Sequence, residues 1–174
     1  MLSLKNAHLS SGDPMKTVIK EPEPEMGVSH VSDETLRAFV GYHMKRAFNV
    51  VQTDLARTLK PFDLRMLTYT ALVLIVDNPG LRQSQLADAM DVERPNLVVI
   101  IDELERRELI VRDRVPTDRR AYALKATLAG RQLCEKAVAA VTAHEQRLLE
   151  NMDATTRDTV IAAMQLIQKS LSKG

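Results

Sequence analysis

The residues that could support catalysis or bind a metal are few in this 174-residue chain. They comprise four histidines (His8, His30, His43 and His144) and a single cysteine, Cys134. The chain has no His-x-x-x-His or Cys-x-x-Cys pair, which argues against a catalytic or structural zinc site. It also has no glycine-rich phosphate-binding loop. The sequence therefore predicts a binding protein without a cofactor rather than an enzyme.

Cys134 has two interpretations. Arg131 and Lys136 lie close to it in sequence, so a Cys134-based redox sensor or small-molecule enzyme remains an alternative. A reactive thiolate needs a specific electropositive setting, and we therefore favour a small buried or half-buried residue. A lone cysteine also excludes an intramolecular disulfide and fits a reducing compartment.

No signal peptide pattern is visible at the N-terminus, and the longest apolar run, residues 71–76, is far too short to cross a bilayer. We therefore expect a cytoplasmic protein with no membrane partner.

Recognition of a nucleic acid is indicated by residues 95–107. Four apolar residues form one helical stripe: Leu97, Ile100, Ile101 and Leu104. The opposite face holds Pro95, Asn96, Val99, Asp102, Glu103 and Arg106. An asparagine near the start of a helix can pair with adenine in a major groove, and an exposed valine can contact thymine methyl groups. The alternative is a small helical domain on which this valine is incidentally exposed.

The residues before this segment predict a helix-turn-helix. Ser84 is expected to cap a first helix over residues 85–90. Asp91 tolerates the left-handed conformation that the turn demands, and Val92 is its apolar plug. Pro95 is expected at the first position of the second helix, where its missing N–H has no partner to lose.

Two β-prone runs follow, residues 109–115 and 120–125, joined by residues 116–119. The expected apolar positions are Leu109, Val111, Tyr122 and Leu124, and the arginines at the polar positions or the tip are Arg112, Arg114, Arg119 and Arg120. Residues 106–125 contain seven basic side chains and three acidic ones, although the whole chain has a net charge of only +1. Such a hairpin can insert arginine into a minor groove, or it can be an ordinary solvated loop.

The segment from Ser84 to Gly130 resembles the winged helix of the multiple antibiotic resistance regulator (MarR) family, and a weaker likeness covers about residues 32–172. Its most specific motifs are Leu-Ala-x-x-Met-x-Val-x-Arg (86–94), Asp-x-Leu-Glu-x-Arg (102–107) and Asp-Arg-Arg (118–120) leading to Thr-x-x-Gly (127–130). The resemblance implies a mainly α fold with a small β-hairpin, a winged helix-turn-helix joined to a helical dimerisation layer. It also implies that Arg120 enters a minor groove.

Three departures from the family pattern stand out. Val98-Val99 replace a frequent Thr-Arg pair on the recognition helix, Asp91 replaces a turn glycine, and Ala126 replaces a core leucine. The residues and the resemblance together predict a DNA-binding set of Ser84, Arg94, Pro95, Asn96, Val98, Val99, Arg106, Arg119 and Arg120.

The domain organisation follows from composition and helical periodicity. Residues 1–30 are predicted to be a flexible tail, residues 31–60 and 127–174 a helical dimerisation region, and residues 61–126 the winged helix-turn-helix. Ser32, Asp63, Thr127 and Asp153 are expected to begin helices, the second of which, residues 64–76, is apolar nearly all round. The first and the last two helices have apolar faces that call for burial against a second copy.

The resemblance also implies a pocket for a small aromatic acid or its acyl-coenzyme A thioester. The candidate effector-binding residues are His43, Arg46, Arg65, Tyr69 and His144. Arginine can clamp a carboxylate, and tyrosine or histidine can hold a phenol or acyl oxygen. The alternative is that these are interface histidines and surface arginines.

Together these features predict a homodimeric transcriptional repressor that binds double-stranded DNA at a palindromic operator and is released by an aromatic effector. The alternatives are a winged-helix module that binds a protein and the Cys134-based sensor.

Overall fold

The computed structural model describes residues 31–115 and 118–171, with residues 114–115, 118–121 and 171 described by their backbone. The predicted tail, residues 1–30, lies outside the described residues. The chain divides into two units, residues 1–38 and 39–174. In chain order the elements are η1 (Leu36–Ala38), α1 (Val40–Leu59), η2 (Lys60–Phe62), α2 (Met66–Asp77), β1 (Leu81–Arg82), α3 (Gln83–Met90), α4 (Arg94–Arg106), β2 (Ile110–Val115), β3 (Asp118–Ala126), α5 (Leu128–Leu148) and α6 (Ala154–Leu171).

The predicted helix from Ser32 begins later than expected. The Ser32 hydroxyl accepts a bond from the Glu34 N–H at 3.5 Å, and the Asp33 carboxylate pairs with Arg37 at 2.7 Å. Such local side-chain bonds compete with helix formation. A turn and the 3-10 helix η1 therefore occupy this stretch, and α1 starts only at Val40, after an extended Phe39.

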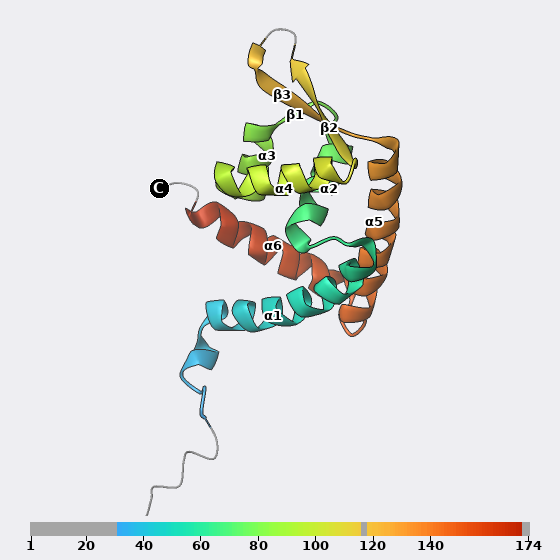
Figure 1. The fold of residues 1–174 in the computed structure, drawn as a ribbon. Helices are drawn as coiled ribbons and strands as arrows, with labels where there is room; N and C mark the ends of the chain where they lie inside the picture. Colours follow the sequence, from blue (N-terminus) through green and yellow to red (C-terminus); the bar gives the residue numbers. More distant parts are fainter. Residues whose placement is uncertain (1–30, 116–117, 172–174) are drawn as a thin grey trace, which may run out of the picture. The chain divides into compact units, whose positions relative to one another are not determined.

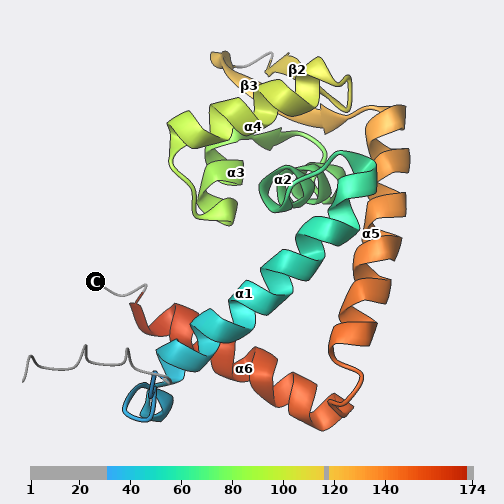
Figure 2. The ribbon, with the colours of Figure 1, turned by 60° about the horizontal axis from the view of Figure 1, so that its bottom comes forward.

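Helix α2 is central, as its composition predicts. It packs against α1, α3, α4, α5 and β3, and Figure 2 shows it among the other helices. Its predicted start at Asp63 is wrong, because Asp63 takes a left-handed conformation (φ 52°) that ends η2. The helix begins at Met66, where the Thr68 hydroxyl accepts a bond from the Arg65 N–H at 2.9 Å.

The helix-turn-helix is formed by α3 and α4, with two corrections at the helix starts. Ser84 is not the cap of α3, because the helix already begins at Gln83 and the Gln85 side chain accepts the Arg82 N–H at 3.0 Å. Pro95 is the second residue of α4 rather than the first. The left-handed turn at Asp91 is confirmed (φ 51°).

The sheet is antiparallel with the order β1-β3-β2, and its short strand β1 was not predicted. Figure 1 shows the β2–β3 hairpin extending beyond the helices. Ile110 and Leu124 are buried, whereas Val111 is exposed, so the expected apolar face of β2 is wrong by one residue. The reason is that Leu109 lies before the strand, where its carbonyl accepts the Thr127 N–H, and the alternation starts at Ile110.

The hairpin connection is also shorter than predicted. Strand β3 begins at Asp118, so Asp118 and Arg119 belong to the strand rather than to the loop. The two strands pair from Ile110 opposite Ala126 to Val115 opposite Asp118.

The last two helices start as predicted. The Thr127 hydroxyl accepts the Gly130 N–H at 3.0 Å at the start of α5. The Asp153 carboxylate accepts the Thr156 N–H at 2.7 Å before α6, and this bond lowers the pKa of Asp153. In α5 Ala137 and His144 are buried, whereas Leu128 is exposed. No side chain described in α6 is buried.

Glu108 is expected to store backbone strain, because it has a left-handed conformation (φ 56°) between α4 and β2. The left-handed conformation costs a residue with a side chain about 1–2 kcal/mol in conformational free energy, whereas it costs glycine little. Glu108→Gly should therefore raise the free energy of unfolding in urea by about 1 kcal/mol. Glu135→Gly, on the exposed face of α5, should lower it by about 1 kcal/mol. A loss of stability in Glu108→Gly would contradict the strain.

Candidate nucleic-acid interface

Helix α4 presents an exposed face opposite its buried stripe. The predicted stripe is confirmed, since Leu97, Ile100, Ile101 and Leu104 are all buried. On the other side Val98 is 45% and Val99 63% exposed. The remaining exposed residues of this face are Arg94, Pro95, Asn96, Asp102 and Arg106. The helix is thus held by apolar packing and leaves an amide and two valines open to a partner.

The acidic side chains of α4 are paired with arginines from other elements. Arg112 of β2 forms ion pairs with Asp102 and, at 3.4 Å, with Glu105. Arg65, at the start of α2, pairs with Glu103. These arginines offset the negative charge that would repel a phosphate backbone. The Arg112 pairs also join the base of the hairpin to α4.

The basic surface is smaller than the count of basic residues predicts. Arg107 and Arg112 bind groups of the same chain, and Lys125 pairs with Asp113 at 2.8 Å. Arg106 is exposed. The side chains of Arg114, Arg119 and Arg120 lie outside the described residues, and their backbones belong to β2 and β3 near the hairpin connection. Ser84 is half-buried in the first turn of α3.

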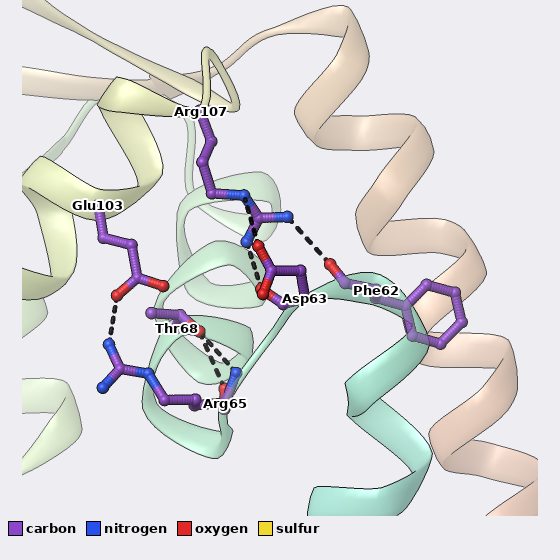
Figure 3. Close-up of polar contacts among 6 residues, drawn as sticks. All are labelled: Phe62, Asp63, Arg65, Thr68, Glu103 and Arg107. Carbon is purple, nitrogen blue, oxygen red and sulfur yellow. Dashed lines mark hydrogen bonds and ion pairs between the residues drawn. The ribbon is translucent and has the colours of Figure 1, made fainter.

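Two arginines connect α4 with the segment that joins α1 to α2 (Figure 3). Arg107, at the end of α4, donates to the carbonyl oxygens of Asp63 and, at 2.9 Å, of Phe62. Arg65 reaches in the other direction to the Glu103 carboxylate. Together, Arg65, Glu103 and Arg107 with the Phe62 and Asp63 carbonyls form what we call the arginine cluster.

Two of the predicted effector-binding residues lie together on α1. His43 and Arg46 line one open hollow with Ala47, Asn49 and Val50. Arg46 donates to the Tyr42 hydroxyl at 2.8 Å. A guanidinium beside an imidazole at such a surface could hold an acidic group.

The other three predicted effector-binding residues are engaged elsewhere. Arg65 belongs to the arginine cluster, and Tyr69 packs against the hydrophobic core, where burial and then the neighbouring Cys134 raise its pKa. His144 is 3% exposed, and its Nδ1 lies 2.8 Å from an Asp54 carboxylate oxygen. A role for any of the five in effector binding stays a prediction.

Cys134 is buried in the core, as favoured above. Burial and the nearby Asp77 carboxylate raise the pKa of its thiol, which disfavours the reactive thiolate. Within residues 31–115 and 118–171 no three histidine, cysteine or acidic side chains gather in a way that could hold a metal ion. In the same ranges no helix has the length and apolar character needed to span a membrane.

Comparison with known proteins decides the family. A model of the MarR family matches residues 64–122. A Thauera aromatica protein named "Putative transcriptional regulatory protein for hcr operon" is 35% identical over 135 residues, which are 77% of this chain and 81% of that protein. The chain belongs to the MarR family. It is therefore a DNA-binding transcriptional regulator of the MarR type.

Solved MarR structures share its fold. The transcriptional repressor CouR bound to a 23-mer DNA duplex is 34% identical, with a TM-score of 0.77, and the match covers 80% of this chain and 99% of that one. CouR from Rhodococcus jostii RHA1 bound to p-coumaroyl-CoA is 32% identical, with a TM-score of 0.69 over 80% of this chain and 96% of that one. The winged-helix fold predicted from the sequence is confirmed.

The structure also identifies polar residues that sequence reasoning missed. Arg107 was given no role of its own beyond its place in a family motif and in the count of basic residues, and Asp54, the partner of His144, was not singled out. Asp54 and His144 lie 90 positions apart, so no local spacing could pair them. For Arg107 the one signal is its place at the end of the Asp-x-Leu-Glu-x-Arg motif.

Proposed function

We propose that this MarR regulator is a homodimeric repressor that binds a palindromic operator and is released by an aromatic acyl-coenzyme A thioester or the parent acid. The exposed face of α4, with its open amide and valines beside a hairpin, is the observation that carries the proposal. The likeness to CouR, seen both with a DNA duplex and with p-coumaroyl-CoA, supports it.

In the proposed complex α4 lies in the major groove. Asn96 pairs with an adenine, and Val98 and Val99 contact thymine methyl groups. Arg119 and Arg120, close to the hairpin connection in β3, enter the adjacent minor groove, where the negative potential attracts guanidinium. Four further residues of the predicted set surround this face and approach the phosphate backbone of the DNA. They lie at the start of α3 and at the start and end of α4: Ser84, Arg94, Pro95 and Arg106.

The proposed dimer uses the helices outside the winged helix, residues 31–60 and 127–174. Exposed large apolar side chains are frequent on α1 and α6: Val40, Phe48, Val50, Val160, Ile161, Leu166 and Ile167. So many exposed large apolar side chains on two helices are costly in water and favour an interface. Burial against a second copy would cover it, and two-fold symmetry then requires a palindromic operator.

The proposed effector acts by favouring a separation of the two recognition helices that no longer matches the DNA. An effector can do this only through its differential affinity for the two arrangements. His43 and Arg46, which share a hollow on α1, are the described residues best placed to hold an acidic group of it.

Selection of bound duplexes from a random pool, followed by mobility shift with p-coumaroyl-CoA, tests this function. We expect a palindromic motif with half-sites about one helical turn apart. The thioester should weaken binding to it by about tenfold or more, whereas free coenzyme A should not, because a typical allosteric coupling is of this size. A motif without symmetry, or a monomer in solution, would contradict the dimeric mode. An unchanged affinity with the thioester and with a panel of aromatic acids would contradict the proposed effector class.

A further inference from the structure

The arginine cluster joins the end of the α1–η2 segment, part of the proposed dimer region, to the end of α4, the proposed recognition helix. Phe62 and Asp63 end the helical segment that continues α1 through η2, whereas Arg107 and Glu103 belong to the end of α4. Figure 3 shows Arg107 extending from the end of α4 to Phe62 and Asp63, and Arg65 extending in the opposite direction to Glu103 on α4. The contacts lie on the far half of α4 from Asn96, so they leave the DNA-facing residues free to bind.

Arg107 satisfies carbonyl groups that the backbone leaves open. The Leu64 and Asp63 N–H groups bond the carbonyls of Leu59 and Lys60, whereas the carbonyls of Phe62, the last residue of η2, and of Asp63, which follows it, accept from the Arg107 guanidinium. Helix ends carry such unpaired, partly negative carbonyls, and the planar guanidinium can reach two of them at once. The Arg107 side chain is only 18% exposed, and its bond to the Phe62 carbonyl is partly buried, whereas its bond to the Asp63 carbonyl is exposed.

The Arg65–Glu103 pair restrains the same junction from the other side. The Arg65 backbone is fixed by Thr68, whose hydroxyl accepts the Arg65 N–H at 2.9 Å and donates to the Arg65 carbonyl at 3.1 Å. The Arg65 side chain itself is largely exposed, so the pair adds little stability. Its contribution is directional, because it holds Glu103 over the start of α2.

The buried residues of α4 are all apolar. The buried stripe of α4 packs on the core through apolar contacts, which oppose shifts of the helix by shape alone and without directional bonds. The arginine cluster supplies the directional bonds that oppose such shifts. It fixes α4 against the end of α1, and the exposed apolar side chains Phe48 and Val50 lie in the middle of that helix.

We propose that Arg107, with the Arg65–Glu103 pair, is a positioning residue that fixes α4 relative to the end of α1 and thereby sets the separation of the two recognition helices. The inference rests on the proposed dimer, because the separation is defined between the recognition helices of two subunits. Through the arginine cluster, a movement of α1 at the dimer interface reaches α4 directly as well as through the core.

The test compares binding to the selected palindrome with binding to the same palindrome lengthened by one or two base pairs at its centre. Wild-type protein should bind the lengthened duplexes about tenfold or more weakly, because helices held at one separation must deform the DNA. Arg107→Met, which keeps the apolar stem, should reduce this difference to about threefold or less. Arg107→Lys should fall between, since an ammonium cannot fork onto two carbonyls.

Matched variants separate positioning from charge and stability. Arg106→Met removes the neighbouring charge, and we expect it to weaken binding to all the duplexes alike. Arg65→Glu and Glu103→Arg should each relax the spacing preference, and the double variant, which restores the pair with reversed charges, should recover it. These comparisons stand even if Arg107→Met proves unfolded by circular dichroism, in which case Arg107→Lys replaces it.

The outcomes are distinguishable. If wild-type protein binds the selected palindrome and the lengthened duplexes with equal affinity, it does not bind the palindrome as a dimer with a fixed separation of its recognition helices. This result would overturn the proposed function. A second outcome is that wild-type protein prefers the selected palindrome over the lengthened duplexes, and that the folded Arg107 variants and both single variants of the Arg65–Glu103 pair show the same preference. The proposed function would then stand, and the positioning role would be overturned.

Discussion

Gly130→Ala is expected to lower the free energy of unfolding by about 3 kcal/mol or more, because a side chain at this position collides with backbone. A Cβ placed on Gly130 would lie 2.0 Å from the carbonyl oxygen of Leu109 and 2.9 Å from its carbonyl carbon. No real Cβ tolerates such contacts, so either the first turn of α5 or the strand start must move.

The surroundings of Gly130 leave no room for that movement. The Leu109 carbonyl also accepts the Thr127 N–H at 3.0 Å, and the Thr127 hydroxyl accepts the Gly130 N–H at 3.0 Å. A shift that relieves the collision therefore breaks the cap of α5 as well. It would also disturb Leu109 and Ile110, which are buried in the core.

Urea denaturation monitored by circular dichroism measures the effect, and Gly41→Ala is the matched control. Gly41 lies in the first turn of α1 with no atom within 4 Å of a built Cβ. The same change there should leave the protein as stable or stabilise it by up to about 1 kcal/mol. A Gly130→Ala protein as stable as wild type would show that α5 and the hairpin are not joined as the structure has them.

Gly130 also illustrates which parts of the fold the sequence predicts. The Thr127 cap depends on groups three residues apart, and the buried stripe of α4 depends on helical period alone, so both could be predicted. The collision at Gly130 depends on Leu109, which lies 21 positions earlier. Only the resemblance to a Thr-x-x-Gly motif drew attention to this glycine.

The errors at the starts of α2 and α3 have a common cause. Ser84 and Asp63 are good capping residues, yet Gln85 and Thr68 supply the bonds at the starts of α3 and α2. In each case a side chain inside the first turn reaches back to the residue before the helix. Residue preference describes the cap itself and misses this arrangement. The apolar face of β2 was misplaced for a different reason, because Leu109 is buried without belonging to the strand.

The candidate site was predicted best where one helix forms it. The exposed face of α4 follows from period alone, and its exposure is confirmed for Val99, while Val98, which the period did not assign to this face, is exposed as well. The charges could not be predicted, because their partners are distant in sequence. Arg65 pairs with Glu103 across 38 positions, and Arg107 reaches Asp63 across 44. Counting basic residues therefore overestimated the surface available to DNA.

Val99→Glu is expected to weaken operator binding by about a hundredfold or more in the same salt concentration, because each subunit would place a carboxylate against the acceptor-rich floor of a major groove. The side chain is 63% exposed, so the change needs no burial of charge in the free protein. The loss should therefore appear in DNA binding and not in folding. Surface substitutions of this kind change the free energy of unfolding by only about 0.5 kcal/mol.

Leu67→Glu is the matched control, since Leu67 is 45% exposed on α2 and belongs neither to the exposed face of α4 nor to the helices proposed for the dimer. It adds the same charge to the whole protein, and so it reproduces any general electrostatic repulsion of DNA. Fluorescence anisotropy with the selected duplex and a non-specific duplex measures both variants. We expect Leu67→Glu to bind both duplexes nearly as wild type does, and Val99→Glu to lose the difference between them. If Val99→Glu kept the wild-type affinity and sequence preference, the exposed face of α4 would not lie in the groove, because a buried carboxylate without a donor could not be tolerated there.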